Sequence, residues 1–232
     1  MSEPFNPFAA PETGGYSQSS LQVGDFERLA GVERGLRMVY LGICGIIISA
    51  IIAGLSAILF PPLAVVAGLG VVICWLMLII GPFICLTAPE ESGAKGLIIA
   101  SILFQLMGFG LSFVPMLGIK VPIATQAVVQ LSGAAGSVLF VFFLMKISKY
   151  IGRDDLRKKG ANILISSVVL IAVTVLAFVT VIGGGGGEML GVIAMLIIGV
   201  GALILFLMYA NLINYLSKAI ASLRANPSVQ AT

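Results

Sequence analysis

Two rows of weakly polar residues run through the middle of the chain, each inside a long apolar segment. Both rows have spacings of 4, 3 and 4 residues, which place each row on one face of a helix. Hydroxyl and amide groups on such a face either bridge neighbouring helices or line a narrow path for a small solute. The sequence leaves both interpretations open. The rows consist of Ser101, Gln105, Gly108 and Ser112, and of Gln126, Gln130, Gly133 and Ser137.

Residues that carry stronger chemistry are missing from the apolar segments. The chain has no His, and no Asp, Glu, Lys or Arg falls in the middle of any such segment. His is the commonest general base, and buried ionisable groups mark proton relays and ion-coupled transporters. Cys44, Cys74 and Cys85 lie in apolar runs, where Cys packs as a small hydrophobic residue. We therefore expect no catalytic residue, no metal site and no cofactor, which argues against an enzyme.

A basic stretch between two apolar segments is the third candidate. Clustered bases attract anionic lipid by roughly 1 kcal/mol for each base near a membrane surface. The same cluster could instead dock a protein partner, or only mark one side of a membrane. The six bases are Lys146, Lys149, Arg153, Arg157, Lys158 and Lys159.

The composition indicates where these residues are held. Hydrophobic residues make up 59% of the chain and charged residues 10%, against about 45–50% and about 25% in an average soluble domain. Such a chain has too little polar surface for a water-soluble globule, so the lipid bilayer is its expected surrounding and nucleic acid is not an expected partner. Segments that are long enough to cross a hydrocarbon core of about 30 Å cover 38–59, 63–86, 97–118, 122–145, 161–182 and 189–214. The predicted fold is all-α, a polytopic membrane protein with six transmembrane helices.

The basic residues predict the orientation of these helices. With six spans, both termini and the links 87–96 and 146–160 share one side of the membrane, and only Lys120 falls on the other. Basic residues mark the cytoplasmic side, so we expect both termini in the cytoplasm. The bases on the shared side are Arg28, Arg34, Arg37, Lys95, Lys146, Lys149, Arg153, Arg157, Lys158, Lys159, Lys218 and Arg224.

A charged motif appears twice and suggests internal duplication. Residues 90–96 and 154–160 both spell acid-acid-x-x-x-Lys-Gly, and each precedes an apolar segment. Together with Arg34-Gly35, this motif predicts three two-helix repeats in parallel orientation. A simpler explanation is compatible with this one, because acids favour helix N-termini and bases mark inner turns. The repeats would cover 35–95, 96–159 and 160–224.

The two ends of the chain differ from the membrane domain, which we place at 25–224. Residues 1–24 are rich in polar residues, Pro and Gly, and both they and residues 225–232 are predicted to be disordered cytoplasmic tails. From Asp25 onward, apolar residues at helical spacing predict a helix that runs into the first span. Glu33 and Arg37 are four residues apart there and are expected to pair.

A short motif in the first tail supports a broad assignment. Asn6-Pro7-Phe8, followed by Pro11, resembles the Asn-Pro-aromatic-x-x-Pro opening of uncharacterised bacterial multi-pass membrane proteins. The resemblance implies a bacterial inner-membrane protein. The expected function is that of a non-enzymatic subunit or scaffold of a membrane complex, with a protein partner or as a homo-oligomer. The alternative is a passive channel or uncoupled small-solute carrier lined by the Ser/Gln rows.

Overall fold

The computed structural model describes residues 23–59, 61–114, 123–182 and 188–225, and within these ranges it is all-α. Two short 3-10 helices, η1 (Cys85–Thr87) and η2 (Glu90–Ser92), join the second and third α-helices. This confirms the predicted fold class. The α-helices are α1 (Val23–Leu59), α2 (Pro61–Ile84), α3 (Lys95–Phe113), α4 (Ile123–Tyr150), α5 (Asp154–Ile182) and α6 (Glu188–Ala225).

Five of the helices are long and apolar enough to cross a membrane, which identifies a multi-pass membrane protein. The sixth predicted span, 161–182, lies within α5 and stays a prediction. The five candidate spans are Gly24–Ser56, Val65–Thr87, Lys95–Ser112, Leu131–Tyr150 and Leu196–Ala225.

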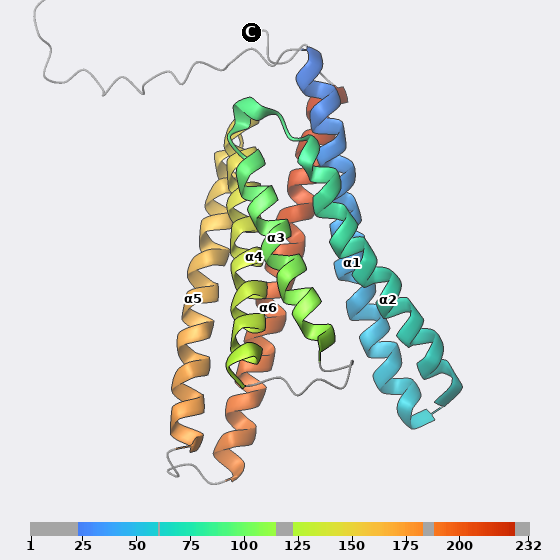
Figure 1. Ribbon diagram of the computed structural model, residues 1–232, viewed down its shortest axis with the longest axis vertical. Coiled ribbons are helices and arrows are strands. Elements are labelled where there is room, and N and C mark those ends of the chain that lie inside the picture. Colours follow the sequence, from blue (N-terminus) through green and yellow to red (C-terminus); the bar gives the residue numbers. More distant parts are fainter. Residues whose placement is uncertain (1–22, 60, 115–122, 183–187, 226–232) are drawn as a thin grey trace, which may run out of the picture.

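The helices form three successive antiparallel pairs, α1 with α2, α3 with α4, and α5 with α6 (Figure 1). Helix α6 also packs against α1, and α4 packs against α5. The start of α1, the end of α6, the α2–α3 connection and the α4–α5 turn all lie at the same end of the bundle. We call this the basic end, because the bases that the sequence assigns to one side lie on these elements. Lys120 lies outside the described residues.

Most of the fully buried core lies toward the basic end. Leu29 and Leu36 of α1, Leu144 and Ile147 of α4 and Leu216 of α6 are almost completely buried. Toward the other end, the α1–α2 pair diverges from the remaining helices, and large apolar side chains are exposed (Figure 1). The hydrophobic effect favours burying an apolar side chain in protein where the alternative is contact with water. It gives no such advantage where the alternative is contact with lipid tails. Tight packing is therefore expected where the bundle approaches water, and apolar exposure where it faces lipid.

Helices α1 and α2 touch through their backbones. A Cβ atom placed on Gly35 would lie 2.6 Å from the carbonyl oxygen of Gly81, and one placed on Gly81 would lie 2.9 Å from the carbonyl oxygen of Gly35. Glycine is required at both positions, because any side chain would force the helices apart. Pro82 follows within α2, which continues only to Ile84 before the 3-10 turn, as a helix-breaking Gly-Pro pair predicts.

Two local expectations change in the structure. Glu33 pairs with Arg224 of α6 at 2.9 Å rather than with Arg37, because α6 lies across this face of α1. Of the predicted tails, Val23, Gly24 and Ala225 are helical, and residues 1–22 and 226–232 lie outside the described residues.

The residues that suggested repeats lie in unlike surroundings. Gly35 is at the α1–α2 crossing, Gly160 approaches Met145, and Gly96 has open space around it. Lys95 pairs with Glu90 at 2.6 Å, whereas its counterpart Lys159 lies over the ring of Tyr215. The three-repeat organisation therefore stays a prediction from the sequence.

Candidate functional site

Ser101 and Gln105 join α3 to α4 at the predicted polar row. Ser101 is completely buried, and its hydroxyl donates a hydrogen bond to the carbonyl oxygen of Gly136 at 2.7 Å. The Gln105 amide donates in turn to the Ser101 hydroxyl oxygen at 3.1 Å. The Ser101 hydroxyl thus bridges the two helices within an apolar segment, where a hydrogen bond has no competition from water, and Gln105 supports it from the same helix.

The partner residues on α4 are small. A Cβ atom on Gly136 would lie 2.7 Å from Cγ of Gln105, and one on Gly108 would lie 2.9 Å from the Ser132 hydroxyl oxygen. Ser132 and Gly136 were not among the predicted residues. Their small-x-x-x-small spacing is the sequence signal that could have found them.

Two serines of the rows, Ser112 and Ser137, bond within their own helices instead of across this contact. Ser112 donates to the carbonyl oxygen of Gly108 at 2.8 Å, and Ser137 donates to that of Gly133 at 3.0 Å, both within their own helices. Ser137 is exposed on α4. The side chains of Gln126 and Gln130 lie outside the described part of the structure.

A very small cavity lies beside this bridge, between α2 and α3. Its volume is about 10 Å³, which is at the lower limit for holding one water molecule. Gln105 is its polar residue, and the rest of the lining is apolar. These apolar residues are Ile79, Phe83, Ile102, Leu106 and Phe109.

The six bases of the predicted lipid-contacting stretch divide between the end of α4 and the start of α5. All six are exposed to solvent, and the turn at Gly152 separates the two groups. Arg157 lies 4.0 Å from Asp154, and Lys159 lies 4.3 Å from the centre of the Tyr215 ring on α6. Together these residues form a cationic edge beside the α4–α5 turn. They are Lys146, Lys149, Arg153, Arg157, Lys158 and Lys159.

The Arg153–Asp155 pair gives this turn a testable pH dependence. Two hydrogen bonds of 2.9 Å from the guanidinium of Arg153 lower the pKa of Asp155 to about 2. Because this pKa is below that of the unfolded chain, the pair stabilises the fold above roughly pH 4, and its contribution is lost as the pH falls through the folded value. An NMR titration of the Asp155 carboxyl carbon should show the low pKa. In Arg153→Gln the pKa should return to roughly 4, and an unchanged value would contradict the pairing.

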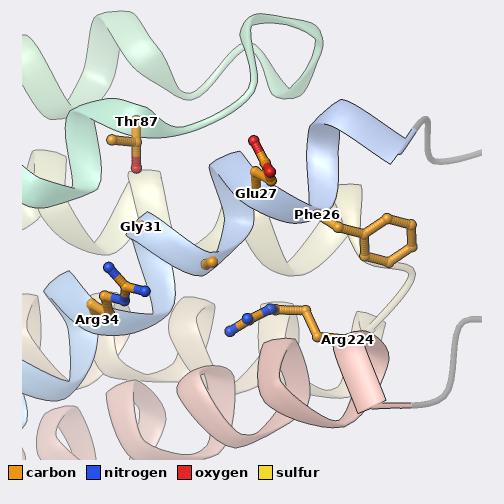
Figure 2. A pocket seen from close by; sticks show the side chains of 7 residues that line it. Phe26, Glu27, Gly31, Arg34, Thr87 and Arg224 are labelled. Carbon is orange, nitrogen blue, oxygen red and sulfur yellow. The ribbon is translucent and has the colours of Figure 1, made fainter.

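A larger groove opens at the basic end, between α1, η1 and the last turn of α6 (Figure 2). Its volume is about 580 Å³, within the range of roughly 300–1,000 Å³ that is typical of small-ligand sites. Two bases and one acid are among the side chains that line it. The lining residues are Phe26, Glu27, Ala30, Gly31, Arg34, Thr87 and Arg224.

Close packing of η1 on α1 forms one wall of this groove. The Thr87 hydroxyl donates to the carbonyl oxygens of Arg28 at 3.2 Å and of Ile84 at 3.0 Å. Gly31 leaves the space that Thr87 occupies, since a Cβ atom at Gly31 would overlap the hydroxyl. On the opposite side, Arg224 is held by Glu33. The spacing of Glu27, Gly31 and Arg34 along one helix face is the only sign of this groove in the sequence.

No family model, curated protein or solved structure matches this chain. Among the residues that the structure describes, no three His, Cys, Asp or Glu side chains lie close enough together to hold a metal ion.

Proposed function

We propose that this multi-pass membrane protein is a non-enzymatic subunit or scaffold of a membrane complex. In this proposal all six helices cross a bacterial inner membrane, and both termini and the basic end face the cytoplasm. The charge distribution and the Asn-Pro-Phe motif support that orientation and location.

The main support comes from how the polar groups are used. In the described ranges, no buried side-chain nitrogen or oxygen lacks a hydrogen-bond partner. The hydroxyls of Ser101, Ser132, Ser167 and Thr174 all bond to backbone carbonyl oxygens of the chain itself. Polar groups that serve packing in this way leave none of those hydroxyl protons for a substrate, which suits a structural role.

The outer surface of α2 is the face that the proposal assigns to a partner helix. Helix α2 packs chiefly on α1 and meets α3 where Trp75 touches Phe109, and its outer face is open (Figure 1). Val65, Leu69, Ile73, Leu76 and Ile80 follow one face of the helix at spacings of three and four residues, and all are exposed. A face of this kind contacts either lipid or a helix of a partner.

The test is to extract the tagged full-length protein from its host in a mild detergent and to record native mass spectra. We expect a second protein in a fixed stoichiometric ratio. An unrelated multi-pass protein with the same tag is the control for contaminants. A lone monomer or a homo-oligomer in each of several mild detergents would contradict a role as subunit of a mixed complex.

The proposal also makes a prediction for solute flux. Because the cavity at Gln105 is about 10 Å³ and holds about one water at most, liposomes that contain the protein should pass small neutral solutes no faster than empty liposomes. A flux assay with Gln105→Leu as the second sample measures this. Flux that the wild-type protein shows and that a folded Gln105→Leu variant loses would contradict the scaffold proposal and support a passive channel.

A further inference from the structure

We infer that the groove between α1, η1 and α6 binds the phosphoethanolamine headgroup of a membrane phospholipid. The first argument is the depth of the groove. Arg34 precedes the predicted start of the first span, residue 38, by four residues, which is about 6 Å along a helix. The polar headgroup layer adds about 5–8 Å on each side of the hydrocarbon core. The Arg34 end of the groove therefore lies at the level where lipid headgroups are found, and the Glu27 end lies about 10 Å further toward water.

The second argument is the charge that the groove offers to a ligand. Arg224 is already paired with Glu33 at 2.9 Å. Across the described ranges, neither Arg34 nor Glu27 forms an ion pair. They are seven residues apart on one face of α1, which separates them by about 10 Å along the axis. One available cation and one available anion in the same groove complement a zwitterion.

The third argument is the match of functional groups. The guanidinium of Arg34 can bind a phosphate through two parallel hydrogen bonds. The carboxylate of Glu27 can accept hydrogen bonds from an ammonium group. The Thr87 hydroxyl donates its proton to backbone carbonyl oxygens, so its oxygen remains an acceptor at the groove wall. Figure 2 shows Glu27 and Thr87 on one side of the groove and Arg224 on the other.

This chemistry separates phosphatidylethanolamine from other phospholipids. Phosphatidylcholine has a quaternary ammonium with no N–H, and it cannot donate to Glu27 or Thr87. Phosphatidylglycerol has no cation for Glu27. The cationic edge beside the α4–α5 turn differs, because it has more bases than acids and suits anionic lipid without a preference for ammonium.

The experiment titrates the full-length protein in detergent with each of the three lipids, all with the same acyl chains, and counts bound lipid by native mass spectrometry. The first phosphatidylethanolamine should bind about tenfold more tightly than the other two lipids. Arg34→Gln should weaken all three lipids, and Glu27→Gln should weaken phosphatidylethanolamine alone and remove the preference. Lys218→Gln, at an exposed base on α6 outside both the groove and the cationic edge, is the control and should leave the preference intact. Thermal unfolding of each variant checks that it is folded.

Two results would overturn the inference. One is equal affinity of the wild-type protein for the three lipids, and the other is an unchanged preference in Glu27→Gln. Either would show that the groove does not select a zwitterionic headgroup. Soluble O-phosphoethanolamine is the second probe, and we expect it to compete only at far higher concentration than the lipid. Competition at the same concentration would rule out a lipid as the occupant and assign the groove to a soluble phosphate ester.

Discussion

Replacing Gly35 by alanine is expected to lower the free energy of unfolding by about 3 kcal/mol, at the upper end of overpacking effects. The new Cβ atom would lie 2.6 Å both from the carbonyl oxygen of Gly81 and from the sulfur of Cys85. The carbonyl belongs to the backbone of α2, so the overlap cannot be relieved by rotating a side chain. The two helices must separate, and the buried contacts around the crossing are weakened with it.

The measurement is unfolding of the purified protein in mixed micelles with increasing sodium dodecyl sulfate. Trp75 is the only tryptophan of the chain, and its ring centre lies 4.5 Å from that of Phe109 on α3, so its fluorescence reports on the fold. Gly54→Ala is the matched control, because a Cβ atom at Gly54 meets nothing within 4 Å. Both variants gain the same helix propensity. Equal stability of the two would show that α1 and α2 do not touch at Gly35.

The helices could be predicted from the sequence because their signals are local. The predicted segment 63–86 corresponds to α2, Pro61–Ile84, since Pro61-Pro62 and Gly81-Pro82 limit the apolar run at both ends. The gathering of the bases at one end of the bundle could be predicted for the same reason, because the charged residues of each turn lie next to it in the sequence.

The contacts between helices could not be predicted, because they depend on how each helix is rotated about its axis. The row that ends at Ser137 has the spacing of a helix face, but α4 presents Ser132 and Gly136 to α3. Ser137 follows Gly136 by one residue, which is a rotation of about 100°. Equal spacing in two rows therefore did not show which residues of the rows meet.

Glu33 shows the same limit for charges. A pair with Arg37 was expected from local spacing, and such pairs stabilise a helix by only about 0.2–0.5 kcal/mol. Its partner in the structure is Arg224, which is 191 residues away in the sequence. Nothing near Glu33 in the sequence indicates that α6 lies beside it. The groove at the basic end was missed for this reason, since α1, η1 and α6 together form its walls.

The second large effect is expected for Gly136→Val, which should destabilise the protein by about 2–3 kcal/mol in the same assay. A Cβ atom there would lie 3.1 Å from the Gln105 backbone nitrogen and from the Ser101 carbonyl oxygen. Separation of α3 from α4 would also lengthen the hydrogen bond from the Ser101 hydroxyl to the Gly136 carbonyl oxygen. Gly133→Val is the matched control, three residues earlier in α4, because a Cβ atom at Gly133 has open space around it.

A double-mutant cycle with Ser101→Ala separates the hydrogen bond from the packing. Alone, Ser101→Ala should cost about 0.6–1.7 kcal/mol, which runs from the average to the largest value measured for hydrogen bonds between membrane helices. In the Gly136→Val background the bond is already strained, so the same substitution should cost clearly less. In the Gly133→Val background it should cost as much as in the wild type. If the effects of Ser101→Ala and Gly136→Val simply add, the hydroxyl does not hold α3 to α4, and Ser101 would again be available to a solute.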